Sequence, residues 1–484
     1  MKNRLIFYTI FFVVAAALVA ALFATGIQSS TGGKGERPRT GSIKWSPCPD
    51  GWATPPDSPG IVCGTLSVPT QRSTNRQSGD VVKLAIAKLP ATGKKLGSLI
   101  LVSGGPGFPG LSIPLARSDA VKKLRENFDI VRYDPRGVGR SEPMIVCSTD
   151  EKVISDSRAW MRSCLAMTRK SFMANLSTLD AVDDLDDLRS ALGDRKITLV
   201  AYSYGTMVAQ LYAGRYPRNV RAMVLDGVVD LSENASTTVV NQYRGFNLAF
   251  NRFAQYCATV AGCPLPASAA GALEAYRSIL SKAASGEIRG PNNARLSPRE
   301  IHDATLFALY SDETWSALAG VLIELNTLSV GNEALQMLKT ASLLSQGDEM
   351  KAAAIISCAD NGPGTGTPSR DVLENTFSTA LKNDAEPLGP ADCSGWPYAA
   401  RVTASMPIRD ASLPQLLFVS QTGDPTTPYG SAVKMSAAFE SPLITREGIG
   451  HTFVLSAGFA CADEKVVRYL VEPGKAVNDA YCSA

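Results

Sequence analysis

The stretch Ile197-Thr-Leu-Val-Ala-Tyr-Ser203-Tyr-Gly205-Thr-Met-Val-Ala-Gln-Leu211 joins an apolar run to a segment of helix-forming residues, with a serine at the junction. A short apolar run of this kind is typical of a strand buried on both faces. Ala201 and Gly205 flank Ser203 and leave room for a sharp strand-to-helix turn. Such a turn lifts a serine hydroxyl to the start of a helix, where the helix dipole favours developing negative charge. The alternative is an ordinary turn in which Ser203 has no chemical role.

Apolar runs on both sides of this turn alternate with helical segments. We expect strands at 98–102, 128–133, 197–201, 222–225, 415–420 and 442–446. Strands that alternate with helices predict a mostly parallel sheet covered by helices on both faces. Long Ala- and Leu-rich stretches from about 230 to 405 have few strand signals, so we expect a helical insertion there. The helix expected at 180–192 carries clustered Asp residues, which we interpret as a solvated face rather than a metal site.

A serine needs a base to accept its proton, and histidine is the usual base near neutral pH. The chain has two histidines. His302 follows the helix-capping pattern Ser297-Pro-Arg-Glu300, and we interpret it as a surface histidine of the insertion. His451 lies between a strand and a helical run, so it is the candidate general base. Asp424 follows the strand at 415–420 and is the candidate acid that orients the imidazole, although Asp before Pro is also a common turn element.

The chain order Ser203, Asp424, His451 is that of the α/β-hydrolase fold, and it differs from the orders in chymotrypsin and subtilisin. The turn around Ser203 resembles the G-x-S-x-G nucleophile elbow of that fold, with Ala201 in place of the first Gly. We therefore predict an α/β protein of the α/β-hydrolase fold, with a mostly parallel central sheet, helices on both faces and an inserted, mainly helical cap.

Two backbone N–H groups are needed to bind the oxyanion of an acyl-transfer reaction. The N–H of Tyr204, the residue after the nucleophile, is the first candidate. The second should come from the Gly-rich loop Ser103-Gly-Gly-Pro-Gly107 that follows an early strand. Gly105 is our candidate donor because Pro106 has no N–H. The alternative is that residues 103–107 form an ordinary turn with no role in catalysis.

Several further motifs resemble one peptidase family. The loop at 103–107 resembles the H-G-G-P-G loop of prolyl iminopeptidases, with Ser103 in place of His, and Asp134-Pro-Arg-Gly-Val-Gly-Arg-Ser141 resembles their D-x-R-G-x-G-x-S segment. Cys358-Ala-Asp360 and Cys393-Ser-Gly-Trp396 resemble the tripeptidyl aminopeptidase branch of the same family, serine peptidase family S33, including its secreted bacterial members. The match begins at about residue 45. Ser103 weakens any expectation of proline specificity, and we expect the substitution at position 201 to be tolerated.

This resemblance implies an exopeptidase that releases short peptides, with tripeptides expected, from free N-termini, without a metal or organic cofactor. Such an enzyme must bind an α-ammonium group, and a carboxylate is the simplest partner for it. Asp360 is the candidate from its position in the family motif, and a structural cap near Cys358 is the alternative. We expect Asp134 and Arg136 to hold the loop near the oxyanion hole through turn hydrogen bonds.

The N-terminus predicts export. Lys2 and Arg4 precede an uncharged apolar run at 5–24, which fits a signal peptide or an uncleaved membrane anchor. Either places the body of the protein outside the cytoplasm, secreted or in the cell envelope, with membrane contact only through an uncleaved anchor. The expected organisation is a signal or anchor at 1–26, a flexible linker at 27–44, the first part of the hydrolase core at 45–233, the helical cap at 234–405 and the C-terminal part of the core at 406–484.

The cysteines also indicate a location outside the cytoplasm. They are even in number, and disulfides are the default in an oxidising compartment. Their sequence neighbours form five short-range couples, so neighbour pairing is the simplest proposal, although the sequence alone does not determine the connectivity. A structural zinc site is the alternative for some of them. It is disfavoured because the sequence has no C-x-x-C pair and only two histidines. The ten cysteines are Cys48, Cys63, Cys147, Cys164, Cys257, Cys263, Cys358, Cys393, Cys461 and Cys482.

Composition narrows the classes of function. The formal net charge of +3 and the lack of a basic tract give no support to a nucleic acid partner. A serine peptidase acting on peptides with a free N-terminus is the leading hypothesis, and an esterase or lipase with the same triad is the nearest alternative. A catalytically inactive, hydrolase-like binding protein is disfavoured, because every triad residue and the Gly-rich loop occur in the expected order.

Overall fold

The structure is a computed structural model of the chain. It describes residues 41–50, 52, 60–72, 80–113, 119–154, 156–328, 330–344, 347–364, 376–377, 380, 393–407, 409–456, 458–475 and 477–483. The predicted signal or anchor at 1–26, and the predicted linker up to residue 40, lie outside these ranges. None of the helices in the described part of the chain is both long enough and apolar enough to cross a membrane.

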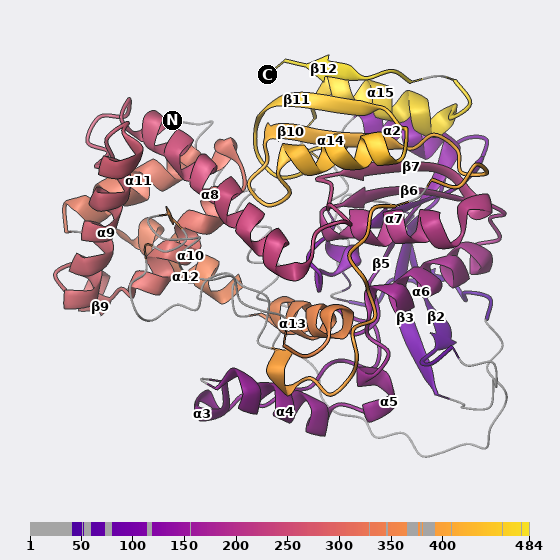
Figure 1. The fold of residues 1–484 in the computed structure, drawn as a ribbon, viewed down its shortest axis with the longest axis horizontal. Coiled ribbons are helices and arrows are strands. Elements are labelled where there is room, and N and C mark those ends of the chain that lie inside the picture. Colours follow the sequence, from indigo (N-terminus) through magenta and orange to yellow (C-terminus); the bar gives the residue numbers. More distant parts are fainter. Residues whose placement is uncertain are drawn as a thin grey trace.

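A ten-stranded sheet forms the centre of the molecule, in the order β1-β2-β3-β5-β4-β6-β7-β10-β11-β12 (Figure 1). The strands are β1 (Ser46–Pro47), β2 (Val62–Pro69), β3 (Val81–Leu89), β4 (Gly97–Val102), β5 (Phe128–Tyr133), β6 (Ile197–Tyr202), β7 (Val220–Asp226), β10 (Leu417–Gly423), β11 (Leu443–Ile449) and β12 (Ala480–Cys482). Pairing is antiparallel from β1 through β3 to β5, and parallel from β5 to β12. The predicted mostly parallel sheet is confirmed.

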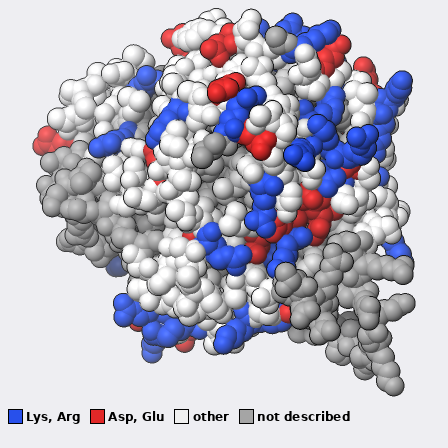
Figure 2. All heavy atoms as spheres, turned by 45° about the vertical axis from the view of Figure 1, so that its right-hand side comes forward, with Lys and Arg blue, Asp and Glu red and all other residues white. Residues whose placement is uncertain are grey.

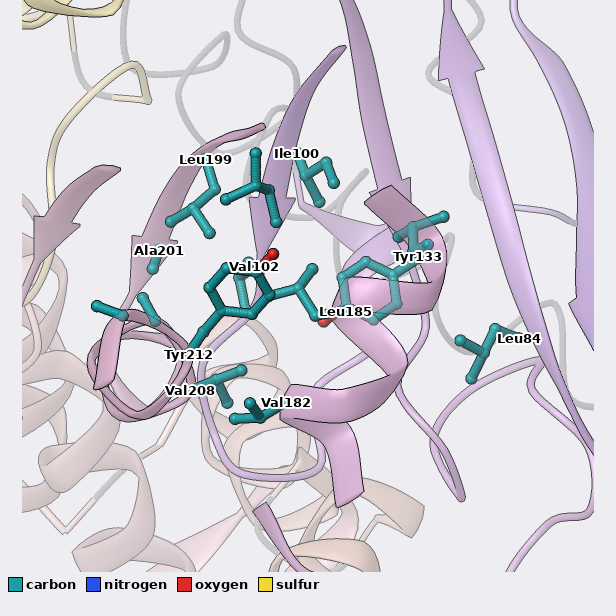
Figure 3. Packing of buried hydrophobic residues seen from close by; sticks show 14 of the residues in the cluster. Leu84, Ile100, Val102, Tyr133, Val182, Leu185, Leu199, Ala201, Val208 and Tyr212 are labelled. Atoms are coloured by element: carbon teal, nitrogen blue, oxygen red, sulfur yellow. The ribbon is translucent and has the colours of Figure 1, made fainter. Parts of the chain in front are cut away.

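Helices cover both faces of the sheet because its parallel strands are apolar on both sides. On one face lie α6 (Thr178–Ala191) and α7 (Tyr204–Arg215), whose Val182 and Tyr212 pack against strand residues such as Ile100 and Leu199 (Figure 3). On the other face, α2 (Asp119–Asn127) and α15 (Ala460–Val471) form a second apolar cluster with β5, β6 and β7.

The remaining core helices and short turns connect these layers. They are α3 (Glu151–Ile154), α4 (Ser157–Met167), α5 (Lys170–Met173) and α14 (Tyr429–Ala438), with 3-10 turns η1 (Gly110–Ser112), η2 (Pro217–Asn219) and η7 (Cys393–Gly395). Two further 3-10 turns, η3 (Pro291–Asn293) and η4 (Asp312–Thr314), belong to the cap described next.

A helical cap with its own apolar core follows β7 and lies to one side of the sheet (Figure 1). It contains α8 (Ala235–Cys257), α9 (Ala269–Ser285), α10 (Pro298–Ala308), α11 (Trp315–Asn326), α12 (Asn332–Leu344) and the small hairpin β8 (Arg289–Gly290) and β9 (Ala294–Arg295). The next helix, α13 (Asp348–Asn361), contributes Ile355 and Cys358 to the apolar cluster of the sheet instead. The range 234–405 therefore contains cap helices and one helix that packs on the core.

The acidic residues of α6 correct one expectation, because they do not form a solvated face. Asp184 is 1% exposed and accepts a bidentate interaction from Arg136, whose side chain is 2% exposed, at 2.7 and 2.5 Å. Asp183 pairs with Arg215, and Asp186 with Arg189. Acidic and basic residues lie next to one another on the face drawn in Figure 2.

His302 corrects a second expectation. The capping box of α10 is present, with Ser297 and Glu300 bonded to each other's backbone N–H. The imidazole, however, is buried in the cap and stacks on Phe377, with 4.6 Å between ring centroids. Burial lowers the pKa of His302 to about 3, so it is neutral in the folded protein at neutral pH.

All ten cysteines form disulfides between sequence neighbours, the pairing proposed above as the simplest. The pairs are Cys48–Cys63, Cys147–Cys164, Cys257–Cys263, Cys358–Cys393 and Cys461–Cys482. Among the described residues, no group of His, Cys, Asp or Glu side chains could hold a metal ion.

Candidate active site

Ser203 occupies a strained turn between β6 and α7. Its φ of 55° and ψ of −125° are rare for a residue with a side chain, and its N–H donates to the carbonyl oxygen of Asp226 at 2.9 Å. A Cβ atom at Gly205 would lie 2.7 Å from the carbonyl oxygens of Val102 and Ser103, so glycine is required there. Ala201 is fully buried in β6, and the turn forms with its methyl group in place.

The Gly-rich loop lies against this serine. A Cβ atom at Gly104 would approach Ser203 Cβ to 2.9 Å and Ser203 Oγ to 3.4 Å. Ser103 Oγ closes the loop by donating to the carbonyl oxygen of Phe108 at 2.8 Å. A Cβ atom at Gly107 would lie 2.3 Å from the Glu349 carbonyl oxygen, so the loop also packs closely on α13. The structure thus brings the residue before Gly105 into contact with the nucleophile candidate.

Tyr204 is the first residue of α7, so its N–H has no acceptor within the helix. Its phenol makes a hydrogen bond of 2.6 Å with Thr178 Oγ1 at the start of α6. Thr178 in turn donates its N–H to Asp360 at 2.7 Å and its hydroxyl to the other carboxylate oxygen. Asp360 is 4% exposed, and burial raises its pKa to about 7. These contacts cap α6 and link Asp360 to the residue after Ser203.

His451 and Asp424 form a buried pair. The imidazole Nδ1 lies 3.0 and 2.9 Å from the two oxygens of Asp424, whose side chain is 1% exposed. The backbone N–H groups of Thr426 and Thr427 each donate to Asp424 at 2.9 Å, which fixes the carboxylate. Burial works to lower the pKa of His451, but the charge and hydrogen bond of Asp424 outweigh it, so the pKa lies above its usual value.

The cap also contacts the loop that carries His451. The N–H of His451 donates to the carbonyl oxygen of Tyr310 at 2.9 Å, and the Tyr310 ring stands edge-on to the imidazole with 5.9 Å between centroids. Gly227 makes room for the ring, because a Cβ atom there would lie 2.9 Å from His451 Cε1. Neither Tyr310 nor Gly227 was predicted, and Gly227 carries only the weak signal of a glycine directly after a strand.

The expected turn hydrogen bonds of Asp134 are present: its two oxygens accept the N–H groups of Leu111 and Arg140 at 2.9 and 2.8 Å. Arg136 points away from this turn toward α6, where it also donates to the carbonyl oxygens of Thr70 and Asn175. Both residues therefore brace the segment after β5.

The family model of the alpha/beta hydrolase fold matches residues 97–456, most of the chain. The chain belongs to the α/β-hydrolase family. It is 33% identical over 509 residues to "Serine protease Hip1" of Mycobacterium tuberculosis (strain ATCC 25618 / H37Rv), covering 94% of each chain.

Two further relatives carry different names. "Carboxylesterase B" of the same strain is 30% identical over 465 residues, covering 88% of this chain and 87% of the relative. "Tripeptidyl aminopeptidase" of Streptomyces coelicolor (strain ATCC BAA-471 / A3(2) / M145) is 25% identical over 478 residues, covering 91% of this chain and 86% of the relative. The resemblance to this peptidase group holds along nearly the whole chain, and the protein is a hydrolase.

Proposed function

We propose that the protein is an exported serine exopeptidase that releases short peptides, with tripeptides the expected product, from free N-termini. The observation that supports this most strongly is the geometry of the three residues. Ser203 stands at a strained elbow beside the Gly-rich loop, and His451 is held by Asp424 through both carboxylate oxygens. The relatives named as a serine protease and a tripeptidyl aminopeptidase support peptides as substrates.

In this mechanism Ser203 Oγ attacks the scissile carbonyl carbon while His451 accepts its proton. The N–H groups of Tyr204 and Gly105 bind the oxyanion. His451 then gives the proton to the leaving amine, and an ester remains on Ser203. Water attacks that ester with His451 again as base, which releases the second product. Asp424 fixes the tautomer of His451 and stabilises the imidazolium without taking its proton.

Export is part of the proposal. The chain has five disulfides. Disulfides form and persist in oxidising compartments, so they support a location outside the cytoplasm. The apolar run at 5–24 supplies the export signal or the anchor. Fractionation of cells that produce the full chain tests this: activity in the cytoplasmic fraction alone would contradict export.

The activity is tested with a tripeptide anilide that has a free amine and with its N-acetylated twin. Purified full-length protein should cleave the free-amine substrate much faster, and Ser203→Ala should abolish cleavage of both. Equal rates on the two substrates would contradict an aminopeptidase.

A carboxylesterase is the second candidate, because one relative is named Carboxylesterase B and because the triad does not determine the acyl substrate. Hydrolysis of simple esters through Ser203, with neither anilide cleaved, would support this candidate instead.

Asp360 remains our candidate for binding the substrate amine, although its carboxylate already accepts two hydrogen bonds from Thr178. If it binds the amine, Asp360→Asn should raise KM for the free-amine anilide about tenfold or more while leaving the N-acetylated substrate unaffected. If it only caps α6, both substrates should suffer equally. Parallel steady-state kinetics on the two anilides separate these roles.

A further inference from the structure

Asp226 connects the two halves of the candidate site. It is the last residue of β7, and its carbonyl oxygen accepts the N–H of Ser203 at 2.9 Å. Its carboxylate oxygen Oδ2 accepts the N–H groups of Phe453 and Val454, the second and third residues after His451, at 2.7 and 2.8 Å. One residue therefore fixes both the nucleophile turn and the loop that carries the imidazole.

The second carboxylate oxygen of Asp226, Oδ1, indicates that this residue does more than fix the loop after His451. Asp226 is fully buried, and its Oδ1 has no hydrogen-bond partner among the described residues. A buried oxygen without a partner costs stability, and in native proteins it calls for an explanation. Gly227 places the edge of the His451 ring directly beside this end of β7, with Cε1 2.9 Å from where a Cβ atom would be.

We propose that Asp226 is a positioning residue for His451, and that its carboxylate also acts as a second negative charge that stabilises the imidazolium formed during hydrolysis. This rests on the proposed function of the triad. Asp424 bonds Nδ1 directly, whereas Asp226 acts on the ring through the loop and through its charge. The two carboxylates therefore hold the base from the ends of different strands, Asp424 directly after β10 and Asp226 as the last residue of β7.

The surroundings of Asp226 support a role for its charge. Burial raises the pKa of Asp226 to about 7, against the opposing effects of the two N–H donors and of His451, so the carboxylate is ionised above that pH. Asp226 in turn contributes to the raised pKa of His451. The titratable or charged groups that act on Asp226, His451 or Asp424 from the packed elements are Tyr202 on β6, Asp424 after β10, Arg446 on β11 and Tyr310 of the cap.

Two isosteric variants, at Asp226 and at Asp463, separate the effect of the negative charge of Asp226 from the effect of its hydrogen bonds to the loop after His451. Asp226→Asn keeps one oxygen for the N–H groups of Phe453 and Val454 but removes the charge. Asp463→Asn is the matched control, because Asp463 is also buried and accepts the N–H of Leu455 from the same loop at 2.9 Å. Asp463 is not among the charges that act on His451.

The pKa of His451 can be measured directly, because the chain has two histidines and His302 is neutral down to about pH 3. NMR titration of histidine-labelled, full-length protein should show a fall of about half a unit or more in the His451 pKa in Asp226→Asn. Asp463→Asn should leave it unchanged. With an ester substrate, the acid limb of kcat/KM should move to lower pH by the same amount, and kcat should fall roughly threefold to tenfold.

An unchanged pKa and kcat in Asp226→Asn, or equal shifts in both variants, would overturn the proposal. If Asp226→Asn does not fold, the wild-type titration decides: Asp226 should produce a second inflection in the His451 curve, and a single inflection contradicts the proposal. These titrations do not depend on peptide cleavage, so they remain decisive for Asp226 even if the peptidase proposal fails.

Discussion

At the scale of the residue, the space beside Ser203 should be sensitive to a single methyl group. In Gly104→Ala the new Cβ would lie 2.9 Å from Ser203 Cβ and 3.3 Å from the Tyr202 carbonyl oxygen. The serine must then shift, and we expect kcat/KM to fall about a hundredfold, because sub-ångström placement of the nucleophile controls the rate. Gly214→Ala on α7 is the control, since nothing lies within 4 Å of its Cβ position. Ester hydrolysis per active site should be unaffected in the control, and equal activity of both variants would contradict the prediction.

Ser203, Asp424 and His451 could be chosen as triad candidates from the sequence because the chemistry demands particular residue types at defined points of the chain. With two histidines in the sequence, the choice of base was nearly fixed. Asp226, Gly227 and Tyr310 could not be predicted in the same way. Asp226 and Tyr310 act on His451 through backbone N–H and C=O groups of segments far apart in the chain, and these leave no pattern in the sequence.

At the scale of the element, helical periodicity in the sequence predicted α6. It did not predict that arginines from other segments pair with the acidic residues of this helix. Arg136 comes from a turn after β5 and is buried against Asp184, so the pair depends on tertiary contacts. Arg136→Met should lower the free energy of unfolding by about 3–5 kcal/mol, because the buried carboxylate of Asp184 loses its bidentate partner and keeps only the longer contact with Arg72, at 3.3 Å. Arg299→Met breaks the pair with Asp303 on α10, where the arginine is 47% exposed, and should cost about 0–1 kcal/mol. Urea unfolding with intact disulfides measures both, and equal losses would contradict the distinction.

The buried histidine of α10 should make the cap sensitive to acid. The pKa of His302 is about 3 in the folded protein, against 6.5 when exposed, so the unfolded chain binds a proton that the folded chain does not. Stability from this group is present above pH 6.5 and is lost as the pH falls toward 3. Between pH 7 and pH 4.5 the loss should be about 2–3 kcal/mol in the wild type and absent in His302→Gln. The same pH dependence of unfolding in both proteins would contradict this.

At the scale of the whole molecule, the central strands were predictable because each is a continuous apolar run, and most of their ends lie within two or three residues of the expected positions. The antiparallel strands β2 and β3 and the three-residue β12 were not predicted. β2 is no continuous apolar run, because it buries Cys63, Leu66 and Val68 among partly buried or exposed positions, and β12 is too short to show a pattern. The sheet order joins strands that are distant in sequence, and no local signal specifies it.

The cap and the sheet have separate apolar cores but meet at the candidate site. Tyr310 of the cap accepts the N–H of His451, and Gly245 of α8 packs on the carbonyl of Pro425, next to Asp424. A cap that loosens should therefore inactivate the enzyme before the sheet unfolds. Phe253 is fully buried in the cap and packs edge-on against Trp315 at 5.8 Å. Phe253→Ala should destabilise the cap by about 3–5 kcal/mol.

On heating, Phe253→Ala should lose ester hydrolysis several degrees below the temperature at which the amides of β6 lose protection from hydrogen exchange, because Tyr310 can hold the loop of His451 only while the cap is folded. In the wild type the two temperatures should lie closer together. If activity and protection of β6 disappear at one temperature in the variant, then the cap and the sheet unfold as a single unit. In that case a perturbation of the cap would reach His451 only by unfolding the sheet that carries Ser203.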